Sequence, residues 1–388
     1  LSEAAQTLGY FDAEFEQHTI RVDPTSYQAS VNLVLNTGKR YRYGKITVDQ
    51  KILSENAMSK YLLLKTGDNY EAVDLINQEQ LLQRSGYYKL IKIDVLHEQA
   101  KNYQVPVAIT LTSKKRNNYK FKIGFGSDTG GRVSAEMNRR WTGKKGRQLK
   151  IKGQYAETLS GISLQLINPR QNPEDNTLVY NIDWTKDSND DVISHSVNIG
   201  GKLTRKRSND WIQSASISAL IDRTQVEGDD ETNTELLLFG VGLEKVKADN
   251  LIYPKDGWRI KASVSAAAKV LLSDQDVLQF KLQAKRVKQL GTGRLLARMN
   301  VGSTTVDDFG SLPKSLRFFA GGGNSVRGYA YESLGEVNDN GSVIGGRQLL
   351  DLSLEYQYPV TDSWDAAVFV DAGNAFNSWS DNNLKVGA

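Results

Sequence analysis

Side chains that carry out acid–base, covalent or metal chemistry are few and scattered in this sequence of 388 residues. The chain has no cysteine and three histidines, His18, His97 and His195. A disulfide framework and a thiolate metal site are therefore excluded, and no histidine-rich metal site is expected. His195 falls in a predicted strand without a cluster of acid–base partners, so a barrel enzyme such as a protease or lipase is a remote alternative.

Glycine-rich and charged segments do not indicate a cofactor or a nucleic acid either. Residues 321–323 are three consecutive glycines, but the lysine and hydroxyl residue of a phosphate-binding loop do not follow them. The chain has 49 basic and 45 acidic residues and a net charge of +4, which is too small an excess for a general polyanion binder. We expect no enzymatic activity, no cofactor and no nucleic-acid partner.

One motif remains whose residues could bind a partner, and it contains an arginine. Val326, Arg327, Gly328 and Tyr329 lie in a connection that runs from about residue 305 to 347, far longer than a hairpin needs. On a mobile surface loop this arginine would simply be solvated. If the loop is folded into the protein, Arg327 needs a carboxylate partner, because an unpaired guanidinium out of water is costly.

The elements that would position this loop are strands. From residue 119 onward apolar and polar side chains alternate with a period of two, which is typical of strands with one apolar face. Strands of about ten residues, apolar on one face and rich in Lys, Ser and Gln on the other, fit a transmembrane barrel better than a soluble sandwich. Thirteen strands are predicted, at residues 119–126, 131–141, 148–157, 161–167, 176–186, 192–204, 211–224, 235–247, 257–271, 276–289, 294–304, 348–360 and 364–376.

A fourteenth strand begins at Leu384 and is cut at Ala388. We therefore expect residues 117–388 to form an antiparallel β-barrel domain that lacks its last strands and carries a long inward loop at 305–347. Such a wall would not be stable in lipid as it stands, because the hydrogen-bonding groups along its edges would be unpaired.

The phase of two late strands supplies partners for Arg327. In the strand at 364–376, Val368 and Val370 suit the lipid-facing side, which turns Asp371 inward. In the strand at 348–360 the same reasoning turns Glu355 inward. Asp371 is the first candidate for an ion pair with Arg327 and Glu355 is the second.

Residues 1–116 instead mix helix and strand signals and contain a repeat. The pattern at residues 8–11 returns 77 positions later, at 85–88. The second copy, residues 42–116, is complete: a strand at 43–49, helices at 54–64 and 71–84 with Ser54 as N-cap, and strands at 88–96 and 104–112. The first copy, residues 1–41, begins inside its second helix, so we expect the chain to be a fragment of a longer one.

The order of strand, two helices and two strands resembles the polypeptide-transport-associated (POTRA) domain, whose sheet edge can accept an extended client segment. Residues 316–329 with the Arg-Gly-Tyr motif, 353–359, and 368–373 with an Asp-x-Gly pattern extend the resemblance over essentially the whole chain. These segments resemble the outer-membrane assembly superfamily that joins α+β POTRA domains to an all-β barrel. Within it, the likeness is strongest to the TamA family of the translocation and assembly module.

The resemblance implies a barrel of about sixteen strands with the loop inside it. Val326 to Tyr329 would then form a structural latch, with Arg327 paired to Asp371. The first strand would meet the last one weakly and form a lateral gate, and its glycines would weaken its pairing further. The gate strand comprises Tyr119, Phe121, Ile123, Gly124, Phe125 and Gly126.

The function implied by the resemblance is non-enzymatic. A member of this superfamily would help to fold β-barrel proteins, autotransporters among them, and insert them into the outer membrane of a Gram-negative cell. Its POTRA domains would reach into the periplasm and bind TamB there, and its other partners would be client proteins and the lipid bilayer. The alternatives within the superfamily are a two-partner secretion transporter and the central assembly subunit BamA; a passive porin is a remote alternative.

Overall fold

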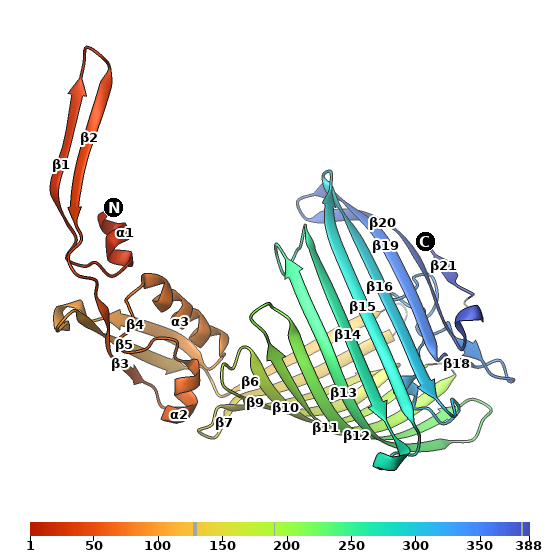
Figure 1. The fold of residues 1–388 in the computed structure, drawn as a ribbon. Helices are drawn as coiled ribbons and strands as arrows, with labels where there is room; N and C mark the ends of the chain where they lie inside the picture. The colour runs from red at the N-terminus through yellow and green to blue at the C-terminus, as the bar shows by residue number, and fades with distance from the viewer. Residues whose placement is uncertain (127–129, 190, 382) are drawn as a thin grey trace. The chain divides into compact units, whose positions relative to one another are not determined.

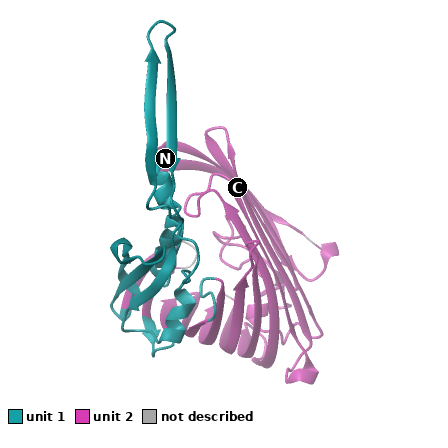
Figure 2. Cartoon of the chain, turned by 60° about the vertical axis from the view of Figure 1, so that its left-hand side comes forward, with its two compact units in different colours: residues 1–117, 139–147, 170–174 teal, residues 118–138, 148–169, 175–388 magenta. Residues whose placement is uncertain are grey.

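The computed structural model describes residues 1–126, 130–189, 191–381 and 383–388 (Figure 1). The chain divides into two compact units, coloured separately in Figure 2. Unit 1 contains residues 1–117, 139–147 and 170–174, and unit 2 contains residues 118–138, 148–169 and 175–388. Over the described ranges, no helix combines the length and the apolar character that crossing a membrane requires.

Unit 1 contains a three-stranded sheet with two short helices and one longer one. The central strand β5 pairs in parallel with β3 and antiparallel with β4, and β1 and β2 form a separate hairpin. The elements in order are α1 (Ser2–Thr7), β1 (Glu14–Asp23), β2 (Gln28–Asn36), β3 (Arg42–Asp49), α2 (Glu55–Met58), η1 (Ser59–Tyr61), α3 (Ala72–Arg84), β4 (Tyr88–Val95), η2 (His97–Gln99) and β5 (Gln104–Ser113). The predicted order of strand, two helices and two strands is confirmed for residues 42–113.

The first predicted helix of that order is shorter than expected. Ser54 does act as the N-cap, because its Oγ accepts a hydrogen bond from the Ala57 backbone N–H at 3.3 Å. Helix α2 nevertheless ends at Met58, and the single 3₁₀ turn η1 follows it. The backbone N–H of Leu63 bonds at 2.7 Å to the side-chain oxygen of Gln78 on α3 instead of continuing the helix. A tertiary contact therefore replaces the last predicted turns.

The core of unit 1 lies between the helices and the sheet. Gln78 is fully buried there, and its amide nitrogen donates to the backbone oxygen of Tyr61 at 2.8 Å. Helix α3 ends at Arg84, and Gly86, whose φ of +77° suits glycine, starts the chain toward β4. The fully or nearly fully buried hydrophobic residues are Tyr43, Met58, Tyr61, Leu82, Tyr87, Tyr88, Val105, Val107 and Ile109.

Unit 2 is one curved sheet of 14 strands whose order follows the chain from β6 to β21, apart from the short pair β17–β18 (Figure 1). The thirteen predicted strands are all present, twelve of them within three residues of both expected ends. The strands are β6 (Asn117–Gly126), β7 (Gly130–Thr142), β8 (Arg147–Ala156), β9 (Leu159–Pro169), β10 (Asn176–Ser188), β11 (Val192–Lys206), β12 (Ile212–Val226), β13 (Thr232–Ala248), β14 (Gly257–Ala267), β15 (Val277–Leu290), β16 (Gly293–Val306), β19 (Gln348–Thr361), β20 (Trp364–Phe376) and β21 (Lys385–Gly387).

One predicted boundary is wrong. The strand predicted at 257–271 ends at Ala267, and a 3₁₀ turn, η3 (Lys269–Leu271), follows it. The side chain of Asp276 accepts a hydrogen bond from the Lys269 backbone N–H at 2.8 Å, and Leu272 has a positive φ of 59°. These two features turn the chain back toward β15, so the apolar side chains that suggested a longer strand lie in a turn.

The two faces of the sheet differ as the alternating pattern predicts. The outer face carries exposed apolar side chains, including Phe121 at 79% and Ile123 at 89% exposure on β6. The inner face carries polar and charged side chains, including Asp351 and Asp371, which are 3% and 0% exposed. A sheet with an apolar exterior and a polar interior is typical of outer-membrane barrels.

Candidate functional site: an arginine held against the inner face

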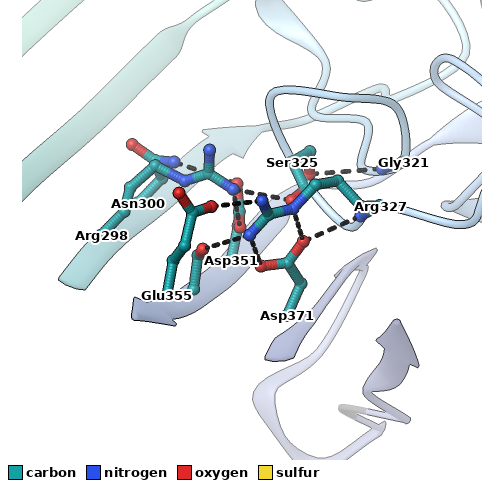
Figure 3. A network of polar contacts seen from close by, with 9 residues as sticks. Arg298, Asn300, Gly321, Ser325, Arg327, Asp351, Glu355 and Asp371 are labelled. Carbon is teal, nitrogen blue, oxygen red and sulfur yellow. Dashed lines mark hydrogen bonds and ion pairs between the residues drawn. The ribbon is translucent and has the colours of Figure 1, made fainter. Parts of the chain in front are cut away.

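The chain segment between β16 and β19, residues 307–347, lies against the inner face of the sheet and presents Arg327 to it (Figure 3). A tight backbone turn makes this possible. The Gly322 N–H bonds to the Tyr329 carbonyl at 3.0 Å, and the Ser325 N–H bonds to the Gly322 carbonyl at 3.0 Å. Gly322 and Gly328 have φ angles of +96° and +92°, which side chains with a Cβ rarely adopt.

Arg327 is bound on every side of its guanidinium group. Its Nε and Nη2 donate to the two carboxylate oxygens of Asp371 at 2.6 and 2.9 Å, a bidentate arrangement. Its Nη1 forms an ion pair with Glu355, and Nη2 also donates to Ser353 Oγ at 3.2 Å. The structure therefore brings both sequence-predicted carboxylates, Asp371 on β20 and Glu355 on β19, to the same guanidinium.

Burial and an aromatic ring strengthen this contact. The Asp371 side chain is completely buried, and the Arg327 side chain is 23% exposed. The guanidinium carbon lies 3.4 Å from the centre of the Phe369 ring, which is cation–π geometry. Hydrogen bonding to Asp371 raises the pKa of Arg327 above its ordinary value, so the residue is a permanent cation.

A second arginine supports the turn from the neighbouring strand. Arg298 on β16 donates to the Ser325 carbonyl at 2.7 Å and lies 3.6 Å from Asp351. Asn300, two positions along the same strand, donates to the other oxygen of Asp351 at 3.0 Å. Asp351, Ser353 and Glu355 are thus successive inward-facing residues of β19 that all bind the loop or a residue that supports it. Figure 3 shows Asp351 and Glu355 beside the two arginines.

The other residues of the predicted latch contribute packing. Val326 is fully buried and forms a small apolar cluster with Ala320 and Leu334, against which Tyr329 packs. A Cβ at Gly373 of β20 would come within 3.0 Å of the Val326 side chain. The close packing of Val326 against β20 therefore requires glycine at position 373.

Sequence reasoning missed Ser353, Phe369 and Arg298 as members of this site. Each has the inward phase of its strand: Ser353 lies two positions before Glu355, and Phe369 lies two positions before Asp371. The strand phase could have found all three, but a phenylalanine on a polar face and an arginine far from the motif did not indicate a partner of Arg327.

The predicted gate strand is the edge strand β6. Its residues Tyr119, Phe121, Ile123 and Phe125 point to the exposed outer face, at 59%, 79%, 89% and 79% exposure. A Cβ at Gly124 would lie 3.0 Å from Arg132 Nε of β7, so the glycine also makes room for an inward side chain.

No group of His, Asp and Glu side chains suited to a metal ion is found among the described residues. The chemistry that the residues around Arg327 offer is the recognition of a cation by carboxylates within the chain. Its elements define a class: an antiparallel membrane-type β-wall whose long loop folds inward and is fixed to two late strands by one arginine.

The chain belongs to the Omp85 superfamily, because the Omp85 superfamily domain matches residues 142–387. A curated relative, the "Outer membrane protein assembly factor BamA" of Nitratidesulfovibrio vulgaris, is 20% identical over 99% of this chain. That match covers 50% of the relative, so the chain spans about half of its length.

Solved structures show the same fold at low identity. BamA from Haemophilus ducreyi lacking POTRA domains 1–3 is 17% identical and aligns with a TM-score of 0.82 over 97% of this chain and 79% of that one. CdiB from Acinetobacter baumannii is 15% identical and aligns with a TM-score of 0.58 over 99% of this chain and 72% of that one. The barrel architecture expected from the sequence is thus of the Omp85 type, whereas membership of the TamA family within it is not established by these similarities.

Proposed function

We propose that this chain is part of an outer-membrane assembly factor that folds client β-barrel proteins, autotransporters among them, and inserts them into the outer membrane of a Gram-negative cell. It acts without enzymatic catalysis. The observation that carries the proposal is the Arg327 contact with Asp371 and Glu355 inside an Omp85-type wall. Val326 to Tyr329 serve as the latch that fixes the loop while the wall engages a client.

In this proposal residues 42–116 are a complete POTRA domain and residues 1–41 are the C-terminal part of another, both in the periplasm. The β3–β5–β4 sheet with α2 and α3 supports the first assignment. Residues 117–388 are the barrel domain. Clients enter the bilayer by strand addition at a lateral gate bounded by β6, where Gly124 and Gly126 reduce the strength of pairing.

Two assignments within the superfamily follow from different observations. The motifs around Arg327 and Asp371 belong to the superfamily as a whole, and the resemblance of the whole sequence favours the TamA family, with TamB as the periplasmic partner. The similarity to BamA proteins favours a central assembly subunit. Copurification from envelope extracts separates them, since a TamA-type protein would retain TamB when tagged, and a protein that never does so is not of that type.

The other candidate, which the resemblance of the sequence to the superfamily leaves open, is a two-partner secretion transporter. Reconstitution of the full-length protein in liposomes distinguishes secretion from insertion. We expect added client barrels to become membrane-embedded and protease-resistant. Clients that instead appear in the liposome interior, with none embedded, would show that the protein is a secretion pore.

Arg327→Ala tests the role of the latch in the same assay, and we expect it to reduce client insertion about tenfold, the effect of a 1.4 kcal/mol change. Arg223→Ala is the matched control, because Arg223 is exposed on β12, with a 3.4 Å ion pair to Glu231 and a 3.0 Å hydrogen bond to Asn233. Unchanged insertion by a folded Arg327→Ala protein would remove the latch from the mechanism.

A disulfide tests lateral opening. The 388 residues contain no cysteine, so a cysteine at Lys122 of β6 and one on the closing strand form a unique pair once any other cysteine of the full-length protein is replaced. We expect oxidation to block client insertion and reduction to restore it. Full activity of the crosslinked protein would refute a gate at β6.

A further inference from the structure

A second buried cation, Lys314, lies in the same loop, 13 positions before Arg327. Lys314 is in the 3₁₀ turn η4 (Lys314–Leu316), and its side chain is 1% exposed. Its Nζ lies 2.5 Å from Asp187 of β10 and 2.9 Å from Glu332 of the loop. A lysine is rarely buried so completely unless it is paired.

Polar side chains of the wall form hydrogen bonds with the loop backbone on both sides of Lys314. Thr234 of β13 donates to the Ser311 carbonyl at 2.7 Å, and Gln279 of β15 donates to the Leu316 carbonyl at 2.7 Å. Because these buried carbonyls accept hydrogen bonds from side chains of the wall, the turn has a specific binding site on the inner face of the sheet.

Arg317 holds the turn together from within. It donates to the carbonyls of Leu312 and Gly310, both at 2.7 Å, and to that of Ile344 at 3.3 Å. Burial lowers the pKa of Arg317 to about 10, so it keeps its charge at neutral pH. Residues 310–317 are therefore held in one conformation by hydrogen bonds within the loop.

An apolar cluster also joins this part of the loop to the wall. Five adjacent strands, β12 to β16, each contribute one inward side chain to it, and the loop contributes three. The cluster consists of Leu220, Leu236, Ala267, Val277 and Val306 from the wall with Phe309, Leu312 and Leu316 from the loop. It shares no buried member with the cluster of Ala320, Val326 and Leu334 around the Arg327 latch.

We propose that Lys314 is a second anchor, independent of Arg327, which holds residues 309–318 as a plug across the inner space of the barrel and closes it to ions. The two anchors hold different parts of the wall: Lys314 reaches β10, whereas Arg327 reaches β19 and β20. This role concerns permeability and goes beyond client insertion.

Single-cysteine reporters can test the proposal, because these 388 residues contain no cysteine and any cysteine elsewhere in the full-length protein can be replaced. Leu312→Cys is the plug reporter and Val326→Cys is the latch reporter, since both positions are 0% exposed. In the full-length protein in lipid, we expect Lys314→Met to increase the rate of maleimide labelling of the plug reporter at least tenfold and to leave the latch reporter unlabelled. Arg327→Ala should do the reverse.

Conductance gives a readout that a merely stabilising residue would not change. In planar bilayers with KCl we expect Lys314→Met to open long-lived ion-conducting levels that the parent protein lacks, and Lys314→Arg to restore closure. Lys269→Met is the matched control, because Lys269 makes an exposed ion pair with Asp307 at the start of the same loop, at 3.3 Å.

Each outcome decides between the alternatives. Labelling of both reporters after Lys314→Met would show a single cooperative anchor, and labelling of neither, with unchanged conductance, would show that Lys314 holds no plug. Either result overturns the proposal. If Lys314→Met does not fold, Glu332→Gln removes one partner and leaves Asp187, and the same two reporters are read.

Discussion

Arg327 meets Asp371 through three hydrogen bonds: two come from the guanidinium group, at 2.6 and 2.9 Å, and one from the Arg327 backbone N–H, at 3.1 Å. The carboxylate therefore binds the side chain and the main chain of the loop at once. Because Asp371 is completely buried, the loss of its partner would leave an uncompensated charge.

We expect Arg327→Ala to destabilise the barrel by about 3–5 kcal/mol, the cost of leaving one partner of a buried pair alone. The measurement is the temperature at which the full-length protein loses its compact, heat-modifiable form on a denaturing gel. Asp371→Asn in the Arg327→Ala background should recover part of the loss, because it removes the orphaned charge. A double variant less stable than the single one would contradict the ion-pair account.

The ion pair of Arg327 with Asp371 should not titrate between neutral pH and about pH 11. A cation whose folded pKa is raised contributes stability that is complete below its unfolded pKa and is lost as the pH rises through the folded pKa. The ordinary pKa of arginine already lies above this range, and hydrogen bonding to Asp371 raises the folded pKa of Arg327 further, so titration of this residue should not change the wild-type melting temperature between pH 7 and about 11. Arg327→Lys should lose stability on approaching about pH 10.4, where lysine titrates. Equal alkaline profiles for the two proteins would contradict this expectation.

Gly302→Ala should disturb the loop through a single methyl group. A Cβ at Gly302 of β16 would lie 2.4 Å from the Phe318 ring, which lies beneath Lys281 at 5.5 Å. The ring must move, at a typical cost of about 1–3 kcal/mol for an overpacked site. Heat-modifiability measures the effect, and Gly153→Ala of β8 is the control, because a Cβ there meets nothing within 4 Å. Equal melting temperatures for the two variants would refute the prediction.

Gln78→Leu should weaken unit 1. The leucine keeps the volume but leaves the Leu63 N–H and the Tyr61 carbonyl without their buried partner, at a cost of about 1–3 kcal/mol. Hydrogen exchange of residues 42–113 in the full-length protein measures this, with Gln83→Leu on the exposed face of α3 as the control. If the two substitutions accelerate exchange equally, the buried hydrogen bonds are not the cause.

The wall could be predicted closely from the sequence because a two-residue period is a local signal that a strand retains in any context. The inward phase of Asp371 and Glu355 follows from the same period, and it was enough to nominate both partners of Arg327. The turn at Leu272 could not be predicted this way, because its hydrogen bond from Lys269 to Asp276 depends on the return of β15.

Long-range partners were out of reach for the same reason. Nothing near Lys314 in the sequence indicates that it pairs with Asp187, a residue of β10. The shortening of the first predicted helix likewise depends on Gln78, which reaches Leu63 from a different helix. The local sequence pattern thus predicts the strands and which side chains face inward. Which inward carboxylate pairs with a given cation depends on how the strands are arranged in the folded sheet.

The separation of these partners along the chain determines how the protein can fold. Arg327 is 44 positions from Asp371, and Lys314 is 127 positions from Asp187. Contacts across such separations form late, because the entropy of closing the intervening chain must be lost first. We expect the loop to bind the wall only after β10 has formed and as β19 and β20 come into register, so that the loop fills the interior while the sheet forms around it.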